Sequence, residues 1–122
     1  MNVDHFTLAY IEALLWSTGD ELDGKSIEDF HPDDLAKIKA DCRAFCEQNG
    51  HLLVPANVRH ARSAGSVSEM AGHDFALTRN GHGAGFWDGD WEEAVGGALT
   101  ESSKAFGEST PYVDDDGLVH LA

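Results

Sequence analysis

Basic residues are scarce in this sequence, with 8 Lys and Arg against 22 Asp and Glu and a formal net charge of −14. Such an excess of carboxylates repels a phosphate backbone, so direct binding to nucleic acid is not expected. The same charge suits docking on a basic protein surface, including one that otherwise holds nucleic acid. Solubility alone is the simpler explanation of the charge, and both remain open.

Long hydrophobic runs are also missing. No apolar stretch approaches the ~20 residues that span a bilayer, so no contact with a membrane is expected. The N-terminal segment carries Asp4 and His5 where a signal peptide would have basic residues. We therefore expect a cytoplasmic protein.

Cysteine is limited to Cys42 and Cys46, which lie four residues apart in a helical pattern. A disulfide within one regular helical turn would be strained, so we expect reduced thiols. No second Cys or His pair has the spacing of a zinc finger, and no Ser lies in a G-x-S-x-G motif. We expect no cofactor, no metal, no catalytic residue and hence no enzyme.

The length of 122 residues fits one domain over residues 1–122. Apolar periodicity predicts a helix from Val3 to Trp16, which Gly19 ends, and a second helix that begins at His31-Pro32. Residues 1–54 are thus expected to be helical, and residues 55–71, poor in large apolar side chains, to form a mobile linker.

Segment 72–91, GHDFALTRNGHGAGFWDGDW, contains Asn80-Gly81 between two apolar runs. This dipeptide is typical of a tight β-turn and predicts a β-hairpin in which Arg79 faces His82. One face of that hairpin would bury its larger apolar side chains in the core. That face consists of Phe75, Leu77, Ala84 and Phe86, of which Phe75, Leu77 and Phe86 are the expected core residues.

Residues 72–122 as a whole are predicted to form a hairpin, a helix and a second hairpin. Asp90 and Glu93 have the spacing of a capping box for the helix, which Gly107 would end. The last hairpin would turn at Asp114–Gly117. The predicted fold class is α+β, with three helices packed on a small antiparallel sheet made of two hairpins.

Four side chains in the first predicted hairpin could carry chemistry: His73, Asp74, His82 and Asp88. An imidazole with a carboxylate can act as a general base or as a pair of metal ligands. A structural cross-strand pair of His73 and Asp88 is the simpler interpretation. A small His/Asp-based metal-binding protein or enzyme centred on residues 73–88 is therefore the alternative hypothesis.

The candidate partner-binding residues are acids in two segments and one tryptophan. Trp87 beside several acids would be a plausible anchor for a basic partner. The set comprises Asp20, Glu21, Asp23, Glu28, Asp29, Trp87, Asp88, Asp90, Glu92 and Glu93.

The segments FTLAYIEALLWS, DLAKIKADCRAFCEQN and GHDFALTRNGHGAGFWD, followed by YVDDDG, resemble a small family of proteins encoded by bacteriophages, prophages and plasmids. The resemblance covers almost the whole chain and implies genomic context, not activity. That context implies a location in a host bacterial cell. Together with the acidic charge, it leads us to expect a non-enzymatic inhibitor or modulator of a host nucleic-acid-binding or defence complex. An unassigned interaction or structural role stays the competing hypothesis.

Overall fold

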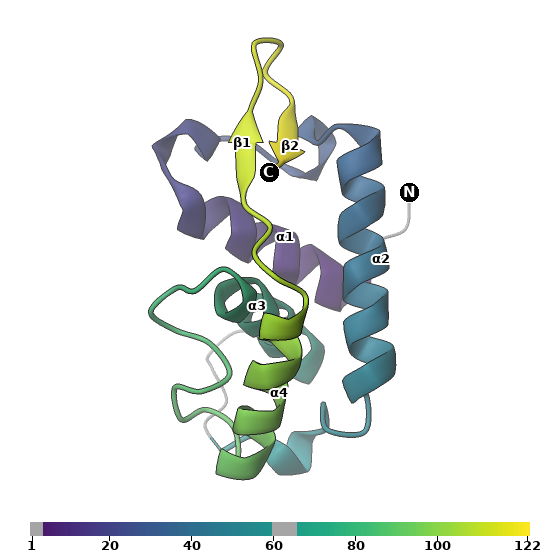
Figure 1. Cartoon of the computed structure of the whole chain (residues 1–122), viewed down its shortest axis with the longest axis vertical. Helices are drawn as coiled ribbons and strands as arrows, with labels where there is room; N and C mark the ends of the chain where they lie inside the picture. The colour runs from purple at the N-terminus through teal and green to yellow at the C-terminus, as the bar shows by residue number, and fades with distance from the viewer. Residues whose placement is uncertain (1–3, 60–65) are drawn as a thin grey trace.

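The computed structural model describes residues 4–59 and 66–122. In this part of the chain, four α-helices pack around one core and a two-stranded sheet extends from one end (Figure 1). The α+β class is confirmed at this level, but the described residues form four helices where three were predicted and one hairpin where two were predicted. The elements are α1 (His5–Thr18), η1 (Asp20–Leu22), η2 (Ile27–Asp29), α2 (Pro32–Asn49), η3 (Pro55–Asn57), α3 (Val67–Arg79), α4 (Glu93–Ala105), β1 (Pro111–Val113) and β2 (Val119–Leu121), where η denotes a 3-10 helix.

The first two predicted helices are confirmed. The Asp4 carboxylate accepts a hydrogen bond from the Thr7 amide at 2.7 Å and caps α1, and Gly19 follows its last residue. Pro32 is the first residue of α2, and His31 caps this helix. Val3, which the sequence assigned to the first helix, lies outside the described residues.

The hairpin predicted for residues 72–91 is wrong, because its whole first strand, up to Arg79, lies in α3. Ser66 and Glu69 form a capping box at the start of this helix. At its end, the Gly81 amide donates to the Thr78 carbonyl at 3.2 Å and the His82 amide to the Leu77 carbonyl at 3.0 Å. These two bonds form a Schellman motif, in which Gly81 adopts a φ of 72°. A glycine at positive φ occurs both at helix ends and in tight turns. The Asn80-Gly81 dipeptide is therefore compatible with either structure.

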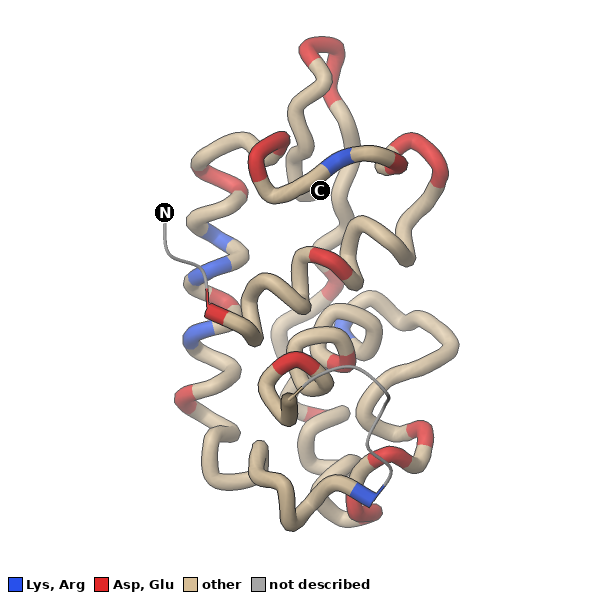
Figure 2. The backbone as a smooth tube through the Cα atoms, turned by 180° about the vertical axis from the view of Figure 1, so that it is seen from behind, with Lys and Arg blue, Asp and Glu red and all other residues tan. Residues whose placement is uncertain are grey.

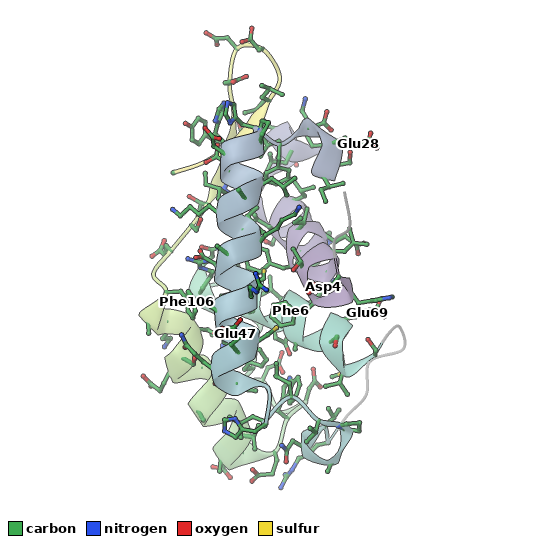
Figure 3. The ribbon with its side chains drawn as sticks, turned by 90° about the vertical axis from the view of Figure 1, so that its right-hand side faces the viewer. Asp4, Phe6, Glu28, Glu47, Glu69 and Phe106 are labelled. Carbon is green, nitrogen blue, oxygen red and sulfur yellow. The ribbon has the colours of Figure 1, made fainter. Side chains whose placement is uncertain are left out.

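Helix α3 lies at the centre of the core. Phe75 is fully buried, and its ring stacks on that of Phe45 in α2 with the centroids 4.2 Å apart. Gly72 packs against α1 so closely that an added Cβ would collide with the Phe6 carbonyl oxygen. Figure 3 views this packing from the side of α2. The prediction that Phe75, Leu77 and Phe86 are core residues is confirmed, although not on the predicted strands.

Residues 80–91 connect α3 to α4 and contain no strand, although Trp91 forms an isolated bridge with a residue outside this segment. The Thr78 hydroxyl accepts a hydrogen bond from the Phe86 amide at 3.1 Å, and an added Cβ on Gly85 would collide with that hydroxyl. The predicted cap at Asp90 is one of the errors. Glu92 caps α4 instead, and its carboxylate accepts from the Ala94 and Val95 amides.

The predicted linker at residues 55–71 also needs correction. It contains η3 and the first turns of α3, and Val58 forms an isolated antiparallel bridge with Trp91. The Arg59 amide donates to the Asp90 carbonyl at 2.7 Å. The middle of the predicted linker, residues 60–65, lies outside the described residues.

The second predicted hairpin is confirmed. Strands β1 and β2 pair antiparallel with Tyr112 opposite His120. The hairpin packs on the start of α2, where Phe30 bridges Val119 and the His31 amide donates to the Val119 carbonyl at 3.0 Å. Across the described residues, every helix is too short or too polar to cross a bilayer.

Candidate functional site

The acids of residues 20–34 gather at the end of the molecule that also carries the hairpin, as Figure 2 shows. Segment 20–34 contains seven acids and one Lys. The turn of the hairpin adds two further exposed carboxylates to the same end. We call this surface the acidic end, and it consists of Asp20, Glu21, Asp23, Glu28, Asp29, Asp33, Asp115 and Asp116.

The other half of the predicted partner-binding set lies at the opposite end of the long axis, around the start of α4 (Figures 1 and 2). The structure therefore does not unite the predicted residues in one surface. Trp87 is 54% exposed there, as the sequence hypothesis required. A hollow beside it is lined by both Arg59 and Glu93, so this end mixes charges of both signs.

Trp16 near the end of α1 is a candidate binding residue that the sequence pattern did not indicate. Its side chain is 76% exposed. It lines a groove between α1 and the loop that carries η1 and η2, together with Leu8, Leu15 and Asp23. A large aromatic side chain thus lies directly beside the acidic end.

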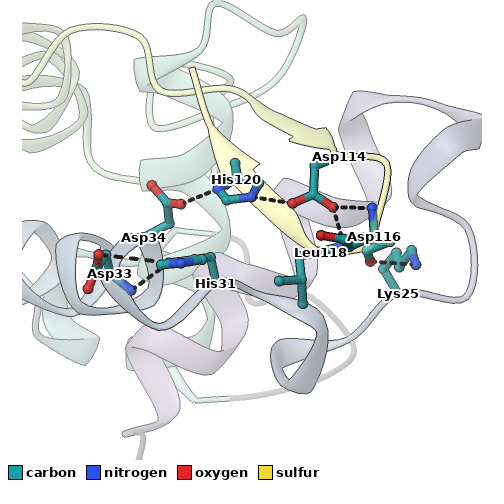
Figure 4. Close-up of polar contacts among 9 residues, drawn as sticks. Lys25, His31, Asp33, Asp34, Asp114, Asp116, Leu118 and His120 are labelled. Carbon is teal, nitrogen blue, oxygen red and sulfur yellow. Dashed lines mark hydrogen bonds and ion pairs between the residues drawn. The ribbon is translucent and has the colours of Figure 1, made fainter.

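A cluster of histidines and carboxylates joins the hairpin to the start of α2 (Figure 4). His120 lies between two carboxylates: its Nδ1 is 2.9 Å from Asp34 Oδ2, and its Nε2 is 2.6 Å from Asp114 Oδ2. His31 and Tyr112 stack on the His120 ring, with centroid distances of 5.1 and 5.5 Å.

The cluster shifts the acidity of two of its members. The hydrogen bond with Asp114 is the main cause that raises the pKa of His120, and Asp34 adds to it against the effect of partial burial. The pKa of Asp114 is lowered, chiefly by the hydrogen bond from the Leu118 amide. The cluster therefore favours an imidazolium held by two carboxylates, or a cation that takes the place of its proton.

The turn itself holds Asp114 in place. Asp114 Oδ1 accepts hydrogen bonds from the Asp116 and Leu118 amides, each at 2.9 Å. Lys25 reaches the same turn and donates to the Gly117 carbonyl at 2.8 Å. The interpretation of residues 114–117 as an acidic turn agrees with these bonds.

The residues of the alternative hypothesis do not converge. Asp74 is fully buried and accepts a hydrogen bond from Trp91 Nε1 at 2.8 Å. Asp88 accepts from the Gly85 amide at 3.3 Å, and His82 lies in the loop after α3. Within residues 4–59 and 66–122, the sole group of three metal-ligating side chains close enough for one ion is His31, Asp34 and His120.

The two thiols are free, and burial raises both pKa values: that of Cys46 to about 11, and that of Cys42 further still. Low thiolate content makes both poor nucleophiles and poor metal ligands at neutral pH.

Sequence reasoning could have found helix α3 but not the histidine cluster. The Ser66–Glu69 spacing is a capping-box signature that indicates a helix at residue 67. No sequence pattern predicts the contact between His120 and Asp34, because that contact depends on where the hairpin packs. Comparisons with protein-family models, with curated proteins and with solved structures found no match to this chain.

Proposed function

We propose that this chain is a non-enzymatic protein-binding module whose acidic end docks on the basic surface of a partner that otherwise holds nucleic acid. Exposed Trp16 anchors the contact. Because the sequence resembles proteins of mobile elements, the proposed partner is a host nuclease, repressor or defence complex. The proposed effect of docking is inhibition of that partner.

The charge of the acidic end supports this proposal most directly. Segment 20–34 has a formal charge of −6, from seven acids and one Lys, with His neutral. The amine of that Lys, Lys25, donates a hydrogen bond to the hairpin at 2.8 Å, which directs it to the protein's own backbone. A field of one sign attracts a basic partner over a distance and raises the rate of association.

Trp16 adds the apolar contact that charge alone lacks. Tryptophan is enriched among residues that dominate binding energy, because it buries a large rigid surface and can donate one hydrogen bond. A side chain 76% exposed beside a groove contributes little to the folded core, so its burial by a partner would be a net gain.

The opposite end and the enzyme hypothesis have weaker support. Arg59 and Glu93 line the same hollow at the opposite end, where the positive charge of Arg59 offsets part of the negative field. The alternative of a metal-binding protein or enzyme centred on residues 73–88 requires His73, His82 and Asp88 to approach one ion, and the described structure does not bring these three together.

The test is capture of partners from a host lysate with wild-type protein and matched charge-reversal variants. The triple substitution Asp20→Lys, Glu21→Lys and Asp23→Lys changes the acidic end. Glu93→Lys, Glu101→Lys and Glu108→Lys make the same change in charge on exposed residues of the α4 region and serve as the control. We expect a partner that wild type and control retain, that the acidic-end variant loses, and that double-stranded DNA displaces.

A second variant, Trp16→Ala, separates anchoring from charge. We expect it to weaken capture by roughly tenfold or more, as the loss of an aromatic hot spot does. Equal capture by all variants, or loss only in the control triple, would contradict docking through the acidic end.

A further inference from the structure

His31, Asp34 and His120 together could hold one metal ion. One ligand-type atom from each of these residues lies within 4.8 Å of the other two. The three come from the residue before α2, the first turn of α2 and strand β2, so the fold brings together what the sequence separates by 86 positions. The ligand types are two imidazoles and one carboxylate.

Asp114 fixes the orientation of the His120 ring (Figure 4). Since Asp114 Oδ1 is bound by two backbone amides of the turn, its Oδ2 is directed to His120 Nε2 at 2.6 Å. With Nε2 as the donor in this contact, the neutral ring presents the lone pair of Nδ1 to Asp34. A carboxylate that holds the far nitrogen of an imidazole is the usual outer partner of a metal-bound histidine.

Nδ1 of His120 and Oδ2 of Asp34 lie 2.9 Å apart. Two lone pairs do not face each other at this distance unless a proton or a metal ion joins them. Two ligands that each lie ~2.0 Å from one zinc ion are separated by about 3 Å, so the observed spacing fits shared coordination.

We propose that His120 Nδ1, Asp34 and the His31 imidazole bind one divalent first-row transition ion, of which Zn²⁺ best fits two imidazoles and a carboxylate. The ion replaces the proton between His120 and Asp34, which is released to solvent. Asp114 acts as a positioning residue for His120. The three protein ligands leave one coordination position to water.

His31 contributes the weakest of the three bonds, because its ring stacks on that of His120 and must turn before its lone pair can point at the same ion. Its Nδ1 accepts a hydrogen bond from the Asp33 amide at 3.1 Å as the cap of α2. Coordination through Nε2 moves the proton of the ring to Nδ1 and removes that bond. Exposed carboxylates of the acidic end nearby, such as Asp33 and Asp115, favour a cation electrostatically.

The test adds Zn²⁺ to chelator-treated wild-type protein and follows the ring nitrogens of all histidines by NMR. We expect saturation at one ion per chain, shifts confined to His31 and His120, and a higher melting temperature. Signals of both rings that do not move at equimolar Zn²⁺, with His120 still doubly protonated, would show that the cluster holds only a proton and would overturn the proposal.

Variants assign the ligands. Asp34→Asn keeps the size of the side chain, and we expect both this variant and His120→Gln to lower the affinity for Zn²⁺ at least ~10-fold. His31→Gln should lower it less than either. His51→Ala removes an exposed imidazole beyond the far end of α2 and should change nothing. Unchanged Zn²⁺ affinity in both Asp34→Asn and His120→Gln, checked as folded by circular dichroism, would equally overturn the assignment.

Discussion

Arg79 offers the sharpest test of the fold, because the sequence predicted it beside a hairpin turn and the structure buries it. Its side chain is 3% exposed. Nε donates to the Gly107 carbonyl at 2.8 Å, Nη2 to the Phe106 carbonyl at 3.2 Å, and Nη1 to Asp41 Oδ2 at 3.0 Å and to the Tyr10 hydroxyl at 3.2 Å. The guanidinium also lies 5.4 Å from the centre of the Phe75 ring. One side chain thus connects all four helices.

Arg79→Ala should destabilise the protein by about 4 kcal/mol. Removal of one partner from a buried ion pair typically costs about 3–5 kcal/mol, since the remaining carboxylate and carbonyl groups lose their donor. For a domain of this size, that loss lowers the melting temperature by more than about 10 °C. Arg79→Lys keeps the charge but not the planar set of five donors, so we expect about half the effect.

The measurement is unfolding by urea, followed by circular dichroism and by tryptophan fluorescence. Arg43→Ala is the matched control, because the Arg43 side chain is 82% exposed and pairs with Glu47 at 3.4 Å. It should change stability by no more than about 0.5 kcal/mol. Equal effects of the two substitutions would refute the buried, hydrogen-bonded position of Arg79.

Three further predictions follow from burial. Phe86→Ala should cost about 3–5 kcal/mol in urea unfolding, because Phe86 is 1% exposed and its ring lies edge-on to that of Trp91 with the centroids 5.5 Å apart. Trp87→Ala on the exposed neighbour should cost under about 1 kcal/mol, and similar costs for the two substitutions would contradict the burial of Phe86. Burial raises the pKa of Cys46 from 9.0 to about 11, so iodoacetamide should alkylate it at pH 8 about 100-fold more slowly than a thiol with an unshifted pKa. An alkylation rate equal to that of the unfolded protein would contradict the burial of Cys46. Burial likewise raises the pKa of Tyr10 from 10.0 to about 12, so the stability that its neutral form contributes is complete below pH 10 and is lost as the pH rises through about 12. Tyr10→Phe should flatten that alkaline decline in stability, and an unaltered decline would exclude Tyr10 as its source.

Local signals predicted the outer parts of the fold well. Gly19 after an apolar stripe, His31-Pro32 at a helix start and Asp114–Gly117 between short apolar runs each match the structure, because each motif satisfies its own backbone groups. The identity of several core residues was also correct, since large apolar side chains are buried in either secondary structure.

The centre of the fold escaped prediction for a physical reason. Helix α3 is packed on nearly all sides, so both Phe75 and its neighbours Asp74 and Thr78 are buried and the helical period is hidden. Because His73, Phe75 and Leu77 alternate with smaller residues, the sequence has the two-residue period that predicts a strand. The candidate site was only partly visible for a related reason: composition located the acids, but no local pattern reports which surfaces two distant segments share.

The most direct test of the proposed function is the ionic-strength dependence of association between the wild-type protein and its captured partner. If the acidic end steers docking, the association rate constant should fall steeply between low salt and about 0.5 M salt, where the Debye length is only a few ångströms. Glu21→Lys should lower that rate constant more than it raises the dissociation rate constant. An association rate constant that is the same at both salt concentrations, and in wild type and Glu21→Lys alike, would contradict the proposal that the acidic end recognises a basic surface.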